Sequence, residues 1–199
     1  PTVASSHRSV EQGTFCADVD YADFFLNFML HRSLRPLAGV DFTKYFPSVD
    51  VDVVGEAWQR AAMGLRSSPY QAVQGVACAE EEVRRDRNQP TNIFRWDRVI
   101  LNLPGSEDYN PARPWVFKVR DDDGSIAADV HGFMDDFRTS GKDKKDGWFS
   151  ARHIGSVSSH LGLQEAARKR RESTRRPGVW IGSVLQTGAL GVFAIRSED

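Results

Sequence analysis

Apolar and β-forming residues near the amino end of the chain lead into a pair of carboxylates. The stretch GTFCADVD at positions 13–20 predicts a buried strand that brings Asp18 or Asp20 to its carboxyl end. The segment YADFFLNFML that follows is too apolar for a surface position, so we expect it inside the fold. After a turn, the stretch PLAGVDF at positions 36–42 predicts a second strand, paired with the first.

Two later segments have the periodicity and end signals of helices. Residues 67–87 open with Ser and Pro, which favour the amino end of a helix. We expect one face of this helix to be buried, made by Tyr70, Val73, Val76, Ala77 and Val83. A second helix is expected over residues 144–161, with one face made by Trp148, Ala151, Gly155, Ser158 and Leu161.

The remaining segments predict short strands around an irregular insertion. Residues 88–124 form this insertion, and we expect its larger apolar side chains to be buried, namely Trp96, Val99, Ile100, Leu101, Trp115, Val116 and Phe117. Residues 125–141 predict two strands that meet at Met134 and Asp135. Residues 177–195 predict two apolar strands on either side of a turn at 186–188.

Charge and composition narrow the function classes. The 199 residues include 26 Lys and Arg against 27 Asp and Glu, a formal net charge of -1, which excludes a strong overall attraction to polyanions. Any nucleic-acid surface must therefore be local. With 40% hydrophobic residues, the chain has the composition of a folded domain able to bury a core.

The number of cysteines and the absence of a signal peptide or membrane span indicate the cellular compartment that we expect for the protein. Cys16 and Cys78 are too few for a disulfide framework or a zinc site, which suits a reducing compartment, and we interpret both as buried apolar residues. No apolar run is long enough to cross a membrane, and no signal peptide is evident. We therefore expect no membrane partner and an intracellular location, in the cytoplasm or nucleus. Because the chain begins with Pro1 and not Met, we expect it to be part of a longer protein.

The candidate chemistry lies in aspartates on separate strands. Asp20 ends the first predicted strand, and Asp135 with Asp136 forms a tight turn between hydrophobic residues in FMDDF. Charges between apolar neighbours are costly unless they have a role. Carboxylates from two strands can together hold two Mg²⁺ ions, the arrangement used for nucleotidyl transfer. His153 and His160 share a helix face but lack a third ligand, so we expect no metal site there.

The order of five motifs resembles that of reverse transcriptases, and more narrowly those of eukaryotic retroelements of the tyrosine-recombinase type. DYADFF with LNFMLH resembles the first palm motif, and MGLRSSPY resembles the second, in which Gly and then Ser-Pro open a helix. FMDD resembles the catalytic turn, with Phe in place of the commoner Tyr. LGLQEAARKR resembles the fourth motif and VWIGSVL the fifth. Together these motifs span residues 15–186.

The resemblance implies a set of metal ligands. Asp20 and Asp135 would be the main ligands of two Mg²⁺ ions, which Mn²⁺ could replace, and Asp136 would be the weaker companion. Asp18 competes with Asp20 for this role. The spacing favours Asp20, because the aromatic that the motif places five residues later is then Phe25, whereas Asp23 lies five residues after Asp18.

The resemblance also implies residues that contact substrate. Phe25 would lie under the incoming sugar and exclude a 2′-hydroxyl, although it could equally be a core aromatic. Gly64, Ser68 and Pro69 would position the template and the incoming nucleotide through close backbone approach, although they could simply begin a helix. Lys169, with its neighbours Arg168, Arg170 and Arg171, would contact phosphates of nucleotide or primer, although a solvated basic helix end is as plausible.

The expected fold class is therefore α+β, a polymerase palm with an antiparallel sheet and helices packed on one face. Residues 13–87 would contain the first two palm motifs, 88–124 an insertion, and 125–199 the Asp-Asp hairpin, a helix and a final hairpin. The expected activity is RNA-directed DNA polymerisation with an RNA or DNA template, a primer and deoxynucleoside triphosphates. Fingers, thumb and RNase H regions are absent from this chain, so we expect it to be inactive alone.

Two other functions remain open from the sequence. The chain could be a relic with the reverse-transcriptase fold that binds nucleic acid without catalysis. It could also be an unrelated globular protein whose Asp-Asp turn is coincidental. Convergence of Asp20 with Asp135 and Asp136 in space would argue against the last option.

Overall fold

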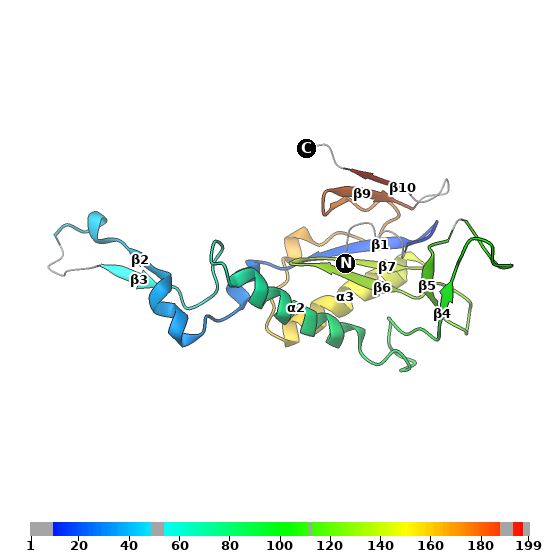
Figure 1. The fold of residues 1–199 in the computed structure, drawn as a ribbon, viewed down its shortest axis with the longest axis horizontal. Helices are drawn as coiled ribbons and strands as arrows, with labels where there is room; N and C mark the ends of the chain where they lie inside the picture. The colour runs from blue at the N-terminus through cyan, green and yellow to red at the C-terminus, as the bar shows by residue number, and fades with distance from the viewer. Residues whose placement is uncertain (1–9, 49–53, 112, 188–192, 197–199) are drawn as a thin grey trace.

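The computed structural model describes residues 10–48, 54–111 and 113–187, together with the backbone of 193–196. It has a mixed α+β fold with small antiparallel sheets (Figure 1). The strands are β1 (Phe15–Asp20), β2 (Gly39–Asp41), β3 (Gly55–Ala57), β4 (Arg98–Leu101), β5 (Val116–Val119), β6 (Asp129–Phe133), β7 (Asp136–Gly141), β8 (Val179–Trp180), β9 (Ser183–Gln186) and β10 (Phe193–Arg196). The helices are α2 (Ser68–Arg84) and α3 (Lys144–His160), with 3₁₀ turns η1 (Phe24–Asn27), η2 (Arg32–Ala38), η3 (Thr43–Tyr45) and η4 (Ala167–Lys169).

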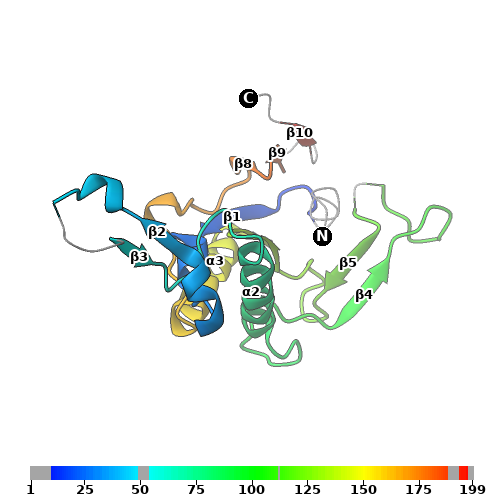
Figure 2. The ribbon, with the colours of Figure 1, turned by 60° about the vertical axis from the view of Figure 1, so that its left-hand side comes forward.

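The central sheet has the strand order β1-β7-β6, with antiparallel pairing throughout. Both helices lie on one of its faces: α3 packs against β1 and β7, and α2 packs against α3 and β6 (Figures 1 and 2). Because side chains alternate along a strand, Ala17, Val19 and Tyr21 enter the main hydrophobic core below the sheet. The expectation of an α+β fold with an antiparallel sheet and helices on one face is confirmed at this level.

The outer edge of β1 is covered by the segment that follows α3. Backbone hydrogen bonds join Ala166 N to Asp20 O at 2.8 Å and Thr174 N to Cys16 O at 2.9 Å. Isolated bridges pair Tyr21 with Glu165 and Cys16 with Thr174 in antiparallel fashion. Residues 164–174 therefore run along β1, and this arrangement places η4 beside the carboxyl end of that strand.

The expected pairing of the second strand with the first is wrong. β2 pairs with β3, with Gly39 opposite Ala57, and all residues of both strands are exposed. The physical reason lies in β1, whose two edges are already taken by β7 and by residues 164–174. Figure 1 shows the β2–β3 pair extending away from the central sheet.

Both helices form close to their expected ranges, but part of their buried faces was misassigned. Tyr70, Val73 and Ala77 are exposed on α2, which instead buries Ser68, Ala72, Val76, Ala79 and Val83. On α3, Ala151, Gly155 and Ser158 are buried as expected, whereas Trp148 and Leu161 are about half exposed. Small residues on the buried faces let the two helices and the sheet approach closely, so the larger side chains lie outside the contact.

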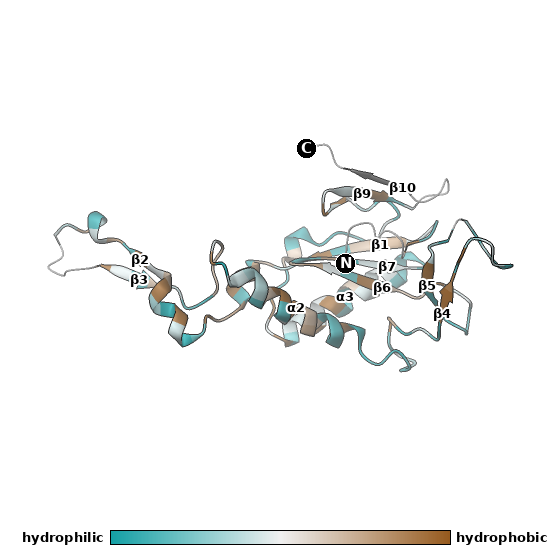
Figure 3. Cartoon of the chain, in the orientation of Figure 1, coloured by the Kyte–Doolittle hydropathy of each residue, from teal (hydrophilic) through white to brown (hydrophobic). Residues whose placement is uncertain are grey.

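The insertion is a second hairpin, β4–β5, and much of its apolar surface is exposed. Val99, Leu101, Trp115 and Val116 are exposed, contrary to expectation, and of the expected residues Phe117 is buried. The reason is the strand alternation: in a two-stranded sheet only one face can pack on the rest of the fold. Figure 3 shows the hydrophobic character of this hairpin. Cys78 is likewise exposed and not buried, whereas Cys16 is buried as expected.

The two hairpins expected in the carboxyl-terminal half differ in outcome. β6 and β7 meet at Met134 and Asp135 as expected. β9 pairs with β10, and of the turn expected between them at 186–188 residue 188 lies outside the described residues. β8 adds a further short partner to β9. This three-stranded sheet lies over the face of the central sheet opposite the helices (Figure 2), where Leu185 packs with Cys16.

Candidate functional site

The site is built where the carboxyl end of β1 meets the start of β7. Asp20 is the last residue of β1 and Asp136 the first of β7, and the two are direct partners in the antiparallel register. Side chains that lie opposite each other in such a pair project from the same face of the sheet, with Cβ atoms about 5 Å apart. Since Val19 and Phe137 point into the helical core, Asp20 and Asp136 point to the opposite face.

Asp135 lies at the same end of the sheet, where its backbone is bonded to the residue after Asp20 and its charge acts on Asp136. Its carbonyl oxygen accepts a hydrogen bond from Tyr21 N at 3.0 Å, which ties the β6–β7 turn to the residue after Asp20. The turn contains Met134 and Asp135, because Phe133 pairs with Asp136. Met134 has a φ of 54°, a left-handed conformation that is uncommon for a residue other than glycine. Such strain is often held at functional sites.

Lys169 neutralises part of this carboxylate cluster. Its Nζ lies 2.9 Å from Oδ1 of Asp20 and donates a hydrogen bond of 3.0 Å to Oδ2. The Asp20 side chain is only 15% exposed, whereas that of Lys169 is 53% exposed. Asp20 Oδ1 is buried and accepts no hydrogen bond from the described residues. The lysine therefore approaches a largely buried carboxylate from the solvent side.

The cluster holds more negative charge than Lys169 can balance. Burial, followed by a hydrogen bond with Asp20 and the charge of Asp135, raises the pKa of Asp136 to about 6, and Lys169 opposes this shift. The hydrogen bond to Asp20, with the charges of Asp135 and Asp136, raises the pKa of Lys169. Three carboxyl groups therefore share one ammonium, and one of them holds its proton unusually tightly. A cation bound at this cluster would relieve the repulsion among its carboxylates.

Asp18, the competitor of Asp20, has a different role. It accepts hydrogen bonds from Nε and Nη2 of Arg138 at 2.7 and 2.9 Å, and Arg138 is only 3% exposed. The Arg138 guanidinium lies 5.3 Å from the ring centre of Trp180 and also donates to the carbonyl of Gly178. This bidentate, largely buried pair joins the two sheets and occupies both oxygens of Asp18.

The residues expected to contact substrate have mixed surroundings. Phe25 lies in η1 and is half-buried between two apolar clusters. Gly64 has a φ of 91° and open space where a Cβ would be, so the turn itself requires glycine. Ser68 is fully buried at the first position of α2, so its side chain does not reach solvent, whereas Pro69 is exposed. A substrate role for these four residues stays a prediction, and for Ser68 it could act only through the backbone.

More side chains of the basic run at 168–171 form ion pairs with carboxylates than the sequence suggested. Arg170 forms a bidentate pair with Glu165 through two short hydrogen bonds, and Arg171 lies 3.6 Å from Asp18. The ammonium of Lys169 contacts Asp20, as described above, although the side chain is exposed along its length. The expectation that all of these cations are offered to phosphates is therefore wrong in this structure, because the neighbouring carboxylates already hold three of them. Arg168 is exposed, and no partner of its side chain is found among the described residues.

The sequence missed both ion pairs that shape the site. The Lys169–Asp20 and Arg138–Asp18 pairs join residues that are far apart in the chain, so no local spacing signals them. One signal was present: alternation places Asp136 and Arg138 on one face of a single strand.

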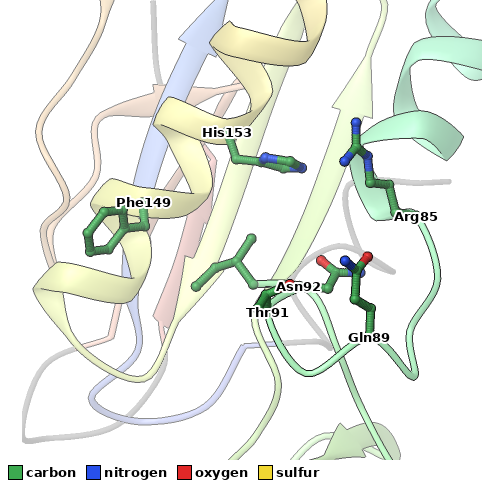
Figure 4. A pocket seen from close by; sticks show the side chains of 7 residues that line it. Arg85, Gln89, Thr91, Asn92, Phe149 and His153 are labelled. Atoms are coloured by element: carbon green, nitrogen blue, oxygen red, sulfur yellow. The ribbon is translucent and has the colours of Figure 1, made fainter.

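A separate pocket of about 280 Å³ lies near the end of α2, lined by Arg85, Gln89, Thr91, Asn92, Ile93, Phe149 and His153 (Figure 4). His153 is 3.0 Å from the carbonyl of Val83 through Nε2, and the Asn92 amide donates to Arg84 and Asp86 carbonyls. Its principal polar groups therefore stabilise the loop after α2. The pocket contains none of the site carboxylates.

The donor set fits a hard divalent cation. Carboxylate oxygens suit Mg²⁺, which keeps several waters and uses few protein ligands, and Asp20, Asp135 and Asp136 bring such oxygens to one end of the central sheet. Across the residues that the structure describes, no three His, Cys, Asp or Glu side chains are already arranged as a metal site. In the metal-free chain, the ammonium of Lys169 contacts both oxygens of Asp20 instead.

Comparisons with known proteins add no relative. No protein-family model matches the chain, and no curated protein matches its sequence. Within the described ranges, no helix combines the length and apolar character needed to cross a membrane.

Proposed function

We propose that this chain is the palm region of a reverse transcriptase, an RNA-directed DNA polymerase that adds deoxynucleotides to a primer 3′-hydroxyl. The observation that carries the proposal is the pairing of Asp20 with Asp136 on one face of the central sheet, with Asp135 in the adjoining turn. The motif order along the sequence predicts that these three residues meet. An unrelated protein with a coincidental Asp-Asp turn has no reason to bring Asp20 to that position.

Asp20, Asp135 and Asp136 would hold the Mg²⁺ ions, or Mn²⁺ in their place. When bound, the two metals supply activation of the attacking hydroxyl and charge stabilisation at the leaving oxygen. The protein contributes fixed positions: Asp20 and Asp136 are held by the β1–β7 register, and Asp135 by the hydrogen bond from Tyr21. Positioning of this kind dominates phosphoryl transfer, because little covalent chemistry is left to the protein.

Lys169, Phe25 and the residues before α2 would act on the substrates. The Lys169 ammonium, at the rim of the site, can balance phosphate charge on a triphosphate. Phe25, in the 3₁₀ turn after β1, would discriminate against the ribose 2′-hydroxyl by steric exclusion. Gly64 lies in the turn before α2 and Pro69 in the first turn of that helix; both are exposed and would line the path of the template. Ser68 is buried and would act only through its backbone.

The direct test is primer extension by the protein that contains this chain. We expect Asp135→Asn to abolish Mg²⁺-dependent extension while leaving the circular dichroism spectrum unchanged. Glu172→Gln is the matched control, because it also removes one carboxylate charge and its side chain is 87% exposed on the outside of the fold. Extension by Asp135→Asn at the level of the control would sink the assignment.

A second candidate is a catalytically inactive relic that binds nucleic acid, and the Lys169–Asp20 ion pair favours it. A permanent salt bridge at Asp20 would keep metal out and would stabilise the fold without catalysis. The two candidates differ in one measurement, the binding of Mn²⁺ to the protein in the absence of nucleic acid. A relic would bind oligonucleotide, and Asp20→Asn would not change its binding of Mn²⁺.

A further inference from the structure

Lys169 differs from the other cations of its segment in how firmly it is held. Arg170 is fixed by two hydrogen bonds to Glu165, whose side chain is 11% exposed. The backbone on either side is fixed as well, since Ala166 N and Arg171 N donate to the carbonyls of Asp20 and Asp18. The Lys169 side chain, 53% exposed, can therefore leave its partner without disturbing β1.

The partner of Lys169 is the carboxylate that would also bind metal. Nζ lies within 3.0 Å of both oxygens of Asp20, so a divalent cation on Asp20 and the ammonium cannot share that place. Two positive groups at one carboxylate would also repel each other. Metal binding at Asp20 must therefore displace the lysine.

We propose that Lys169 is an exchangeable counter-ion, which occupies Asp20 in the metal-free protein and moves to a polyphosphate when metal arrives. The inference rests on the proposed function for the identity of the metal site, and it adds how that site is regulated. Before substrate binds, the lysine reduces the repulsion among the three carboxylates. Because it competes with free metal for Asp20, it weakens the binding of metal alone. Because it can contact polyphosphate, it strengthens the binding of metal together with polyphosphate.

The proposal predicts effects of opposite sign for two probes. For Mn²⁺ alone, the fraction of protein in which Asp20 is free limits the apparent affinity, so Lys169→Met should bind Mn²⁺ about tenfold more tightly, within the ordinary range of coupling between sites. For the Mn²⁺–tripolyphosphate complex, the ammonium is a contact and not a competitor. The same variant should therefore bind that complex about tenfold more weakly than the unmodified protein.

The experiment measures both affinities by the loss of the free Mn²⁺ electron paramagnetic resonance signal and by isothermal titration calorimetry. Lys145→Met is the matched control, because it removes an exposed lysine at the start of α3, at the opposite end of the central sheet from Asp20, and it should change neither affinity appreciably. Lys169→Gln, which keeps a hydrogen-bond donor and lacks the charge, serves as a second variant if Lys169→Met does not fold. It should show the same two signs.

The outcomes separate the inference from the proposed function. If Mn²⁺ binds and Asp20→Asn weakens its binding, but both Lys169 variants match Lys145→Met, the site stands and the counter-ion inference is overturned. If neither the unmodified protein nor any Lys169 variant binds Mn²⁺, the proposed function fails and the inference fails with it. Opposite shifts for the two probes, confined to the Lys169 variants, support the exchange.

Discussion

The raised pKa of Asp136 has a consequence for stability that needs no substrate. Its ordinary value is 3.8 and the folded protein raises it to about 6, with burial as the largest cause. The folded state therefore binds this proton more tightly than the unfolded state does. The resulting stabilisation is fully present below about pH 4 and is lost as the pH rises through about 6.

The magnitude follows from the size of the shift. About two pKa units correspond to about 3 kcal/mol if converted in full, but Asp136 is only partly buried, so solvent screening reduces the effect to about 1 kcal/mol. Because the neighbouring carboxyls interact, the apparent value belongs to the cluster and not to Asp136 alone. We expect Asp136→Asn, neutral at every pH, to raise the free energy of unfolding by about 1 kcal/mol at pH 8 and to change it little near pH 4.

The assay is urea unfolding followed by tryptophan fluorescence at pH 4.5 and pH 8, with a chelator present to exclude divalent metal. Glu172→Gln is the control, because its carboxylate is almost fully exposed and its removal should change the free energy of unfolding by at most a few tenths of a kcal/mol at either pH. If Asp136→Asn and Glu172→Gln show the same difference between the two pH values, the carboxyl cluster is not strained and the reasoning above is refuted.

Two further predictions concern the residues around the cluster. Arg138→Met leaves the largely buried Asp18 without its bidentate partner and should lower the free energy of unfolding by about 3 kcal/mol or more, measured by the same urea titration; a loss under 1 kcal/mol would mean that the pair is dispensable. Phe25→Ala should raise the incorporation of ribonucleotides relative to deoxyribonucleotides in primer extension, and an unchanged ratio with reduced stability would identify Phe25 as a core residue only.

The sequence predicts the helices and strands of this fold better than it predicts which strands pair with each other. Helices α2 and α3 and the β6–β7 hairpin have strong local signals, since periodicity, capping residues and a short turn all lie within one segment. The partner of β1 has no such signal, because strand pairing depends on which edges are free. The segment around residues 164–174 has no strand pattern of its own, yet it takes the edge of β1 that the sequence assigned to residues 36–42.

The buried face of α2 shows a second limit. Tyr70 and Val73 are the larger apolar residues, so the sequence favours them as core, but the helix turns Ser68, Ala72 and Val76 inward. Gly75 explains part of this choice: a Cβ there would lie 2.3 Å from the ring of Phe28, so α2 and the segment after β1 are packed too closely for a large side chain. Hydrophobicity alone cannot signal a contact that is determined by small volume.

The sequence predicts which aspartates form the candidate site, but it does not predict which cation balances their charge. Asp20, Asp135 and Asp136 follow from the strand ends and the turn, and the β1–β7 register places Asp20 and Asp136 opposite each other. That Lys169 contacts Asp20 could not be predicted, because it depends on the path of residues 164–174. The sequence assigned Lys169 to phosphate, and the metal-free structure assigns it to a carboxylate.

Asp18 and Asp20 lie on the same face of β1 but differ in how their charges are balanced. Asp18 is fully matched: a largely buried arginine meets both of its oxygens, and no acidic residue lies opposite it in the register. Two residues further along β1, Asp20 lies opposite Asp136 and shares one exposed lysine with it and Asp135. Evolution of a stable fold would favour the first arrangement at both positions, since uncompensated carboxylates destabilise. The second arrangement is the one that a bound cation, as proposed above, would balance.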